Sequence, residues 1–221
     1  MYLVRVCSLR PLLVLLVLVF VTAPAVAQSG RAGHVEPPPA PESREAELNV
    51  ALRLGMLAPL ERADICPGDS LCVLGGGGSF GVEIERRWPM GVGISVAYHA
   101  WFVDSGGVFE LGIVQIIRAG VGYAFLLESM VHPTLHVAAG ALVFGDTFLV
   151  ETVGGALDVG AGVEVELTDT VALDGGLSFW LFTTTPFTTG RDRTRRSEGL
   201  GLNLALQVTV GLTILAERQG H

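Results

Sequence analysis

The chain has 221 residues, half of them hydrophobic and 16% charged, and its formal net charge is −8. The 14 basic residues are all arginine, opposed by 22 acidic side chains. This acidic balance argues against nucleic acid as a partner.

Residues 1–27 have the features of a secretory signal peptide. Two arginines precede the apolar stretch 12–21, and Ala25-Val26-Ala27 forms a small-x-small cleavage sequence. The competing interpretation, a membrane-spanning helix, needs about 20 apolar residues. Pro11 and Pro24 bracket a shorter core. We therefore expect export and cleavage after Ala27.

Residues 28–44 (QSGRAGHVEPPPAPESR) form a proline-rich lead-in. They carry almost no bulky apolar side chains, so they cannot bury enough surface to offset the entropy of ordering. We expect a disordered or polyproline segment, with His34 solvated.

From residue 45 the chain alternates between apolar and polar side chains, and the clearest example is Leu200–Ile214. An aliphatic residue occupies every second position there, while Gly, Asn, Ala, Gln and Thr stand between. This period of two is typical of a strand with one apolar face. Ordinary strands run to about 5 or 6 residues, so the length indicates a strand that crosses a bilayer.

The same alternation predicts eight strands in residues 45–216, followed by a polar tail at 217–221. Their expected spans are 46–57, 79–88, 91–103, 108–124, 132–145, 154–168, 170–182 and 199–215. An even number returns both ends to one side of a membrane. Three of the four outer connections are predicted to be long, including about nine residues around Asp146, and Asp104–Gly107 is the short exception. The predicted fold class is all-β: an eight-stranded antiparallel up-and-down transmembrane β-barrel.

Composition decides which face is outside. A soluble barrel or sandwich keeps its apolar face inward and needs a charged exterior. The polar face here is instead crowded with small residues that suit a narrow lumen: Gly55, Gly81, Gly93, Gly112, Gly120, Gly122, Gly160, Gly162, Gly176 and Gly201. Aromatic residues near the ends of the apolar face are expected to form interfacial girdles: Phe80, Trp88, Tyr98, Phe102, Phe109, Tyr123 and Phe179. Gln115 falls on the apolar face, and the strand at 132–145 is nearly apolar on both faces, so we expect a bulge or a register error there.

The stretches GVGISVAY, RAGVGYAF, VGAGVEVELTD and Gly211–Ile214 resemble those of eight-stranded bacterial outer-membrane proteins, the group of the OmpA transmembrane domain, OmpX and OmpW. The resemblance covers residues 45–216. It implies an outer-membrane location, insertion by the outer-membrane assembly machinery, and contact with outer-membrane lipids and lipopolysaccharide. The polar tail 216–221 departs from the family's usual terminal aromatic residue.

Ionisable residues on the polar face are predicted to form a charge network in the lumen. They are Glu47, Arg53, Glu83, Glu85, Arg87, Glu110, Arg118, Asp158, Glu164, Glu166 and Asp174, together with His99 and His136. An unpaired buried charge costs several kcal/mol, so these acids must pair, take up protons or keep water. One interpretation is a hydrogen-bonded plug in which Arg53, Arg87 and Arg118 bridge the acids. The other is a wetted, cation-preferring path.

Cys66 and Cys72 are predicted to form a disulfide in an oxidising compartment. A metal site would need more ligands than the nearby aspartates supply. The disulfide and the glycines at 75–78 predict an outer loop that is cross-linked by the bond and moves about a flexible glycine hinge.

The only basic cluster is the run Arg191, Arg193, Arg195 and Arg196, which suits contact with lipopolysaccharide phosphates or another anion. The alternative is a solvated loop tip softened by Asp192 and Glu198. No histidine has a neighbouring serine in a recognisable His-x-Ser arrangement, so we expect no enzymatic activity and no cofactor or metal.

The sequence therefore predicts a monomeric outer-membrane barrel with a structural or surface-interaction role that displays extracellular loops. The alternative function is a narrow passive channel for cations or small solutes through an acidic lumen.

Overall fold

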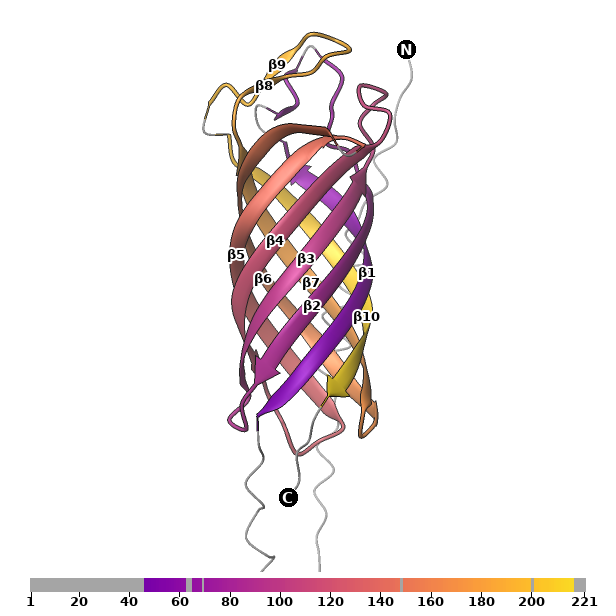
Figure 1. The fold of residues 1–221 in the computed structure, drawn as a ribbon, viewed down its shortest axis with the longest axis vertical. Coiled ribbons are helices and arrows are strands. Elements are labelled where there is room, and N and C mark those ends of the chain that lie inside the picture. Colours follow the sequence, from indigo (N-terminus) through magenta and orange to yellow (C-terminus); the bar gives the residue numbers. More distant parts are fainter. Residues whose placement is uncertain (1–45, 63–64, 69, 148, 200, 217–221) are drawn as a thin grey trace, which may run out of the picture. The chain divides into compact units, whose positions relative to one another are not determined.

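The computed structural model describes residues 46–62, 65–68, 70–147, 149–199 and 201–216. The predicted signal peptide, lead-in and tail lie outside these residues. Within them, eight antiparallel strands close a barrel in the order β1-β10-β7-β6-β5-β4-β3-β2 (Figure 1). The strands are β1 (Glu47–Glu61), β2 (Gly77–Arg87), β3 (Val92–Val103), β4 (Gly112–Ala124), β5 (Val131–Asp146), β6 (Leu149–Thr168), β7 (Val171–Thr184) and β10 (Asn203–Ala216). A separate hairpin joins β8 (Phe187–Thr188) to β9 (Arg195–Arg196).

The predicted all-β, up-and-down barrel is confirmed: each barrel strand pairs with its neighbour in the chain, and β10 closes on β1. In the described part of the chain, no helix is long and apolar enough to cross a bilayer.

The outward face is apolar and the inward face is polar along β10. Val208, Val210 and Leu212 are exposed, whereas Gln207 and Thr209 are buried. A soluble barrel of this kind would show the reverse orientation. The sequence-based assignment of the two faces is therefore confirmed for this strand.

The two ends of the barrel differ in their connections (Figure 1). The turn end carries the short connections 88–91, 125–130 and 169–170, and the loop end carries 62–76, 104–111, 147–148 and 185–202. The prediction of a connection of about nine residues around Asp146 is wrong, because β5 and β6 pair up to Asp146 and Leu149. The connection predicted to be short extends to residue 111. The Asp146 carboxylate accepts hydrogen bonds there from the backbone N–H groups of Glu110 (2.8 Å) and Leu111 (3.0 Å).

The expected bulge near Gln115 is also absent from the described pairings of β4. This strand pairs with β3 and β5 without a register shift. Gln115 does face outward, and its Oε1 accepts a hydrogen bond from the Tyr98 hydroxyl at 3.0 Å. Register shifts occur at Pro59/Glu61, Phe144/Gly145 and Glu166/Thr168, and the second of these lies in the strand expected at 132–145.

The barrel interior has an apolar half at the loop end. Its core combines inward-facing strand residues with residues from the connections: Leu57, Ile65, Val73, Leu74, Trp101, Val103, Val108, Phe109, Val114, Ile116, Leu142, Phe144, Ala156, Trp180, Phe182, Phe187 and Ala205. Edge-to-face ring pairs join Trp101 to Trp180 (5.0 Å) and to Phe182 (5.9 Å). Such pairs add about 0.5–1.5 kcal/mol to area burial. Phe109 belongs to this core, so its predicted place in an outer girdle is wrong.

Candidate functional site

A ring of ion pairs and hydrogen bonds crosses the polar half of the barrel interior. Arg53 of β1 contacts Glu83 of β2 (2.5 Å) and Asp174 of β7 (2.8 Å). Arg118 of β4 contacts the same Glu83 oxygen (2.8 Å) and Asp158 of β6 (3.0 Å). Each arginine thus bridges two acids on different strands, as predicted for a hydrogen-bonded plug.

A second group braces the barrel nearer the turn end. The Arg87 guanidinium binds Glu164 with two hydrogen bonds (2.8 and 3.2 Å) and also contacts Glu85 (2.8 Å). Arg87 lies on β2 and Glu164 on β6, which are four positions apart in the eight-strand order. This bidentate pair therefore spans the lumen between opposite walls.

Glycines on the inward face make room for these side chains. Gly211 of β10 stands between Arg53 and Asp174 in register, and a Cβ atom there would lie 2.6 Å from Asp174 Oδ2 and 2.7 Å from Arg53 Cγ. A Cβ atom at Gly81 would lie 2.8 Å from Nδ1 of His99. Gly93 and Gly160 likewise leave space for Glu85 and His136, whereas Gly55 and Gly120 lie against backbone and uncharged side chains.

The network surrounds a polar cavity of about 60 Å³. Five acids (Glu83, Glu85, Asp158, Glu164 and Asp174) and three arginines (Arg53, Arg87 and Arg118) line it with His99 and His136. One water needs roughly 10–15 Å³ on this measure, so the space suits a few water molecules. The arrangement can hold water beside an excess of carboxylates.

Three of the predicted lumen residues do not line the cavity. Glu110 is exposed in the 104–111 connection, because β4 begins only at Gly112, so its predicted lumen position is wrong. Glu47 begins β1 in register with Arg87 and does not line the cavity. Glu166 lies near the turn end, 3.0 Å from Nε2 of His132.

Sequence reasoning missed the inward-facing His132 and could not give the partners of Gln207. His132 is buried, and its Nδ1 lies 3.0 Å from the Leu126 carbonyl oxygen, which ties the 125–130 connection to β5. It has the same strand parity as His136, so the alternation could have found it. Gln207 accepts a hydrogen bond from the Trp180 indole (2.7 Å) and donates one to Ser79 (2.8 Å).

Ser178 contacts a histidine inside the barrel. Its Oγ lies 3.3 Å from His136 Nε2, and Asp158 Oδ2 lies 3.1 Å from that same nitrogen. In a catalytic triad the serine and the acid engage opposite nitrogens of the imidazole. The arrangement here does not have that geometry.

The cap, defined as the described residues of connections 62–76, 104–111 and 185–202, closes the loop end. The predicted Cys66–Cys72 disulfide is present and packs against the apolar core. It lies between Ile65 and Val73, two residues that are almost completely buried in that core. Two backbone hydrogen bonds join connection 62–76 to connection 104–111. The Gly75 N–H donates to the Asp104 carbonyl (2.6 Å), and the Asp104 N–H donates to the Gly76 carbonyl (3.1 Å). The glycine run is thus tied down at this point.

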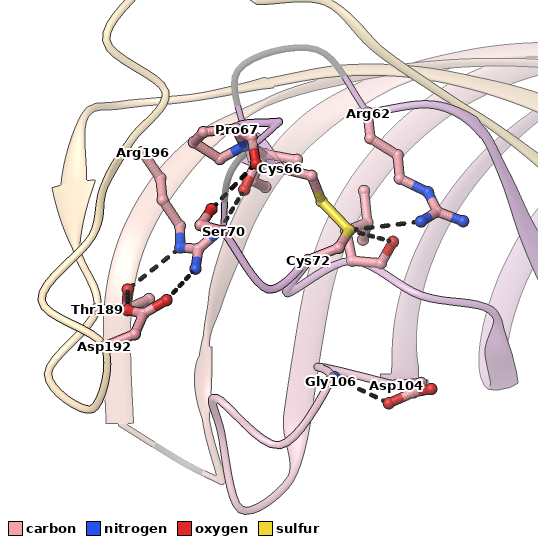
Figure 2. Close-up of a disulfide and its surroundings, with 12 residues drawn as sticks. Arg62, Cys66, Pro67, Ser70, Cys72, Asp104, Gly106, Thr189, Asp192 and Arg196 are labelled. Atoms are coloured by element: carbon pink, nitrogen blue, oxygen red, sulfur yellow. Dashed lines mark hydrogen bonds and ion pairs between the residues drawn. A yellow bond between two sulfur atoms is a disulfide. The ribbon is translucent and has the colours of Figure 1, made fainter. Parts of the chain in front are cut away.

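Arg196 holds the hairpin to the disulfide-bonded connection. Its side chain is 0% exposed and donates hydrogen bonds to the Ile65 carbonyl (3.0 Å), the Thr189 hydroxyl (3.1 Å) and the Asp192 carboxylate (2.5 Å) (Figure 2). The predicted availability of Arg196 for an external anion is therefore wrong, because these partners occupy it inside the cap.

Asp192 is the acidic partner of Arg196. Partial burial of its carboxylate acts to raise its pKa, but hydrogen bonds from the Thr189 hydroxyl and Thr194 N–H, together with Arg196, outweigh burial and lower the pKa to about 2. Asp192 therefore remains charged at neutral pH and is directed at Arg196. The other arginines of the cluster, Arg191, Arg193 and Arg195, are exposed.

Comparison with known proteins places this geometry in a fold class. No protein-family model matches the chain, and a search of curated proteins found no match. Among solved structures, Neisserial surface protein A is similar with a TM-score of 0.51 and 16% identity over 76% of this chain and 96% of that one. OprG of Pseudomonas aeruginosa has a TM-score of 0.47 and 8% identity, over 79% of this chain and 97% of that one. Ail of Yersinia pestis, solved with a heparin analogue, has a TM-score of 0.45 and 14% identity, over 78% of this chain and 99% of that one.

Neisserial surface protein A is an eight-stranded outer-membrane β-barrel, and the chain has this fold. Identities this low show the fold and not the function.

Proposed function

We propose that the chain is an exported outer-membrane barrel that scaffolds the cap for envelope integrity or surface interaction. The exposed apolar outer wall and the long connections at one end support this placement. The proposal includes cleavage after Ala27, contact with outer-membrane lipids and lipopolysaccharide, insertion by the outer-membrane assembly machinery, and a monomeric state.

The observation that carries this proposal is the apolar core in the loop-end half of the lumen. Trp101, Trp180, Phe144 and Phe182 are almost completely buried there, and the cap residues Val73 and Leu74 pack onto the same core. Hydrophobic constrictions close a pore to ions by excluding water. The packed core therefore supports a lumen that is closed between the polar cavity and the loop end.

The test is ion flux through residues 28–221 refolded into planar bilayers. We expect a correctly inserted barrel to be electrically silent. Insertion is checked separately in liposomes of the same lipid by heat-modifiable gel mobility and by protease resistance of the strands. Discrete, reproducible conductance steps from the inserted barrel would contradict a scaffold with a sealed lumen.

A second candidate is the narrow cation channel, which the excess of five carboxylates over three arginines around the cavity favours. This alternative requires an opening through the apolar core. It predicts cation-selective steps that fall when Glu83, Glu164 and Glu166 are changed to Gln, since these changes remove the carboxylates from the path.

We propose no enzymatic activity. The Ser178 hydroxyl and the Asp158 carboxylate compete for one nitrogen of His136, so the imidazole cannot accept a proton from serine while the acid orients its other side. Lipid deacylation or acylation that is lost in Ser178→Ala would overturn this proposal.

A further inference from the structure

The β8–β9 hairpin exposes three arginines within five residues: Arg191, Arg193 and Arg195. In the sequence, Asp192 stands among them and would offset part of their charge. In the structure, Asp192 contacts the buried Arg196 guanidinium at 2.5 Å (Figure 2). The charges of Asp192 and Arg196 neutralise each other, so Asp192 does not offset the charge of the three exposed arginines.

The remaining acid of the hairpin region offsets the exposed charge weakly. Glu198 lies 3.2 Å from Arg195, and their side chains are 64% and 67% exposed. Such a solvated pair contributes about 0–1 kcal/mol and exchanges readily with other ions. The outward surface from Arg191 to Glu198 therefore keeps a local positive charge on a chain whose formal net charge is −8.

The hairpin is fixed to the barrel rim before any ligand binds. Arg196 joins it to the Ile65 carbonyl (3.0 Å), and Ser197 contacts the Thr184 hydroxyl at the end of β7 (2.6 Å). Arg191 donates a hydrogen bond to the Gly107 carbonyl. A fixed hairpin loses less conformational entropy on binding than a free loop tip.

The apolar outer wall reaches the base of this hairpin. Leu149 and Val153 of β6 are 72% and 48% exposed, and Thr185, where the hairpin connection leaves β7, donates its N–H to the Val153 carbonyl (2.8 Å). If the apolar wall marks the acyl layer, the level of the lipid headgroups lies beside the hairpin. Guanidinium groups match phosphate through paired N–H donors.

We propose that Arg193 and Arg195, with Arg191, bind phosphate groups carried by lipids of the leaflet that surrounds the loop end. The inference rests on the proposed membrane placement of the barrel. Arg196 and Asp192 support the site from inside the cap and do not contact the ligand.

The test compares two variants with equal loss of charge. Arg193→Gln with Arg195→Gln removes two outward arginines and, within the described residues, breaks only the solvated Arg195–Glu198 ion pair. Arg62→Gln with Arg86→Gln removes two other exposed arginines: Arg62, which lies in the first connection of the cap with its Nη1 3.6 Å from Cys72 Sγ, and Arg86, which lies near the turn end. Purified full-length mature protein in detergent is titrated with lipopolysaccharide, with enzymatically dephosphorylated lipopolysaccharide, and with soluble polyphosphate, at 50 and 200 mM salt.

We expect the hairpin variant to bind lipopolysaccharide at least tenfold more weakly than the native chain, and the control variant to change affinity less than threefold. Native binding should weaken with salt and with dephosphorylation. Equal loss in both variants, or equal binding of the dephosphorylated lipid, would overturn the phosphate site. Polyphosphate binding as tight as lipopolysaccharide binding, per phosphate, would overturn the lipid-borne source. Heat-modifiable mobility of both variants reports on the barrel, so failure of the proposed scaffold is seen separately.

Discussion

Replacing Arg196 by Met tests whether the cap is held by a buried guanidinium. The change removes hydrogen bonds to Ile65 O, Thr189 Oγ1 and Asp192. Hydrogen bonds to charged groups contribute about 1.5–3 kcal/mol each, and breaking a buried ion pair costs about 3–5 kcal/mol. The Asp192 side chain is 21% exposed and regains water after the change, which lowers the cost. We expect the free energy of cap opening to fall by about 2–4 kcal/mol.

Amide hydrogen exchange of the protein in detergent micelles measures this loss. An effect of that size corresponds to roughly 30- to 1000-fold faster exchange, since each 1.4 kcal/mol is a factor of ten. It should appear at cap amides such as Gly75, Thr189 and Arg193, which are hydrogen-bonded in the structure, while the barrel strands stay protected. The control is Arg195→Met, an exposed neighbour. Equal exchange in the two variants would refute the buried anchor.

Three further changes test other parts of the molecule. Cap amides should stay protected from hydrogen exchange from pH 7 to about 4 and lose protection as the pH falls toward 2. The folded cap lowers the pKa of Asp192 from 3.8 to about 2. The stability that this carboxylate adds to the cap is therefore present above its ordinary pKa and is lost as the carboxylate takes up a proton. Hydrogen exchange across a pH series measures this, and loss of protection already at pH 6 would contradict it. Gly211→Ala should lower the free energy of unfolding in urea by about 1–3 kcal/mol through overpacking, whereas Gly175→Ala, where a Cβ atom meets its nearest neighbour at 3.7 Å, should be tolerated. Val210→Arg, at an outward position that is 59% exposed, should cost about 2–4 kcal/mol in bilayers if the residue faces lipid near the midplane, and no loss there would argue against the proposed placement.

The alternation in the sequence was sufficient to predict the barrel, because a period of two assigns every strand residue to one of two faces. It could not locate the apolar core, since Trp101, Phe144 and Trp180 share the inward parity of the lumen charges. The one signal was the strand near residue 140, which is apolar on both faces. The sequence predicts a bulge or a register error there; β5 does carry a register shift against β6 at Phe144/Gly145, and near residue 140 it also passes from the polar half to the packed half.

The arginine cluster shows a second limit of sequence reasoning. Arg195 and Arg196 are adjacent and chemically identical, yet one is 67% exposed at its side chain and the other is 0% exposed. Their roles are separated by β9, which points successive side chains to opposite faces. A two-residue strand inside a long connection leaves no periodic pattern to read.

The seam between β1 and β10 is the place where the first and last strands of the barrel pair to close the cylinder. The last barrel strand in chain order, Asn203–Ala216, carries no ionisable residue, so its burial in the wall desolvates no charge of its own. Arg53 of β1 forms an ion pair with Asp174 of β7 across Gly211, so this ion pair connects the two strands on either side of β10. Separating β10 from either side has to break this same ion pair. The Arg53–Asp174 ion pair therefore couples the β1–β10 and β10–β7 hydrogen-bond ladders, and we expect the two ladders to separate together rather than one at a time.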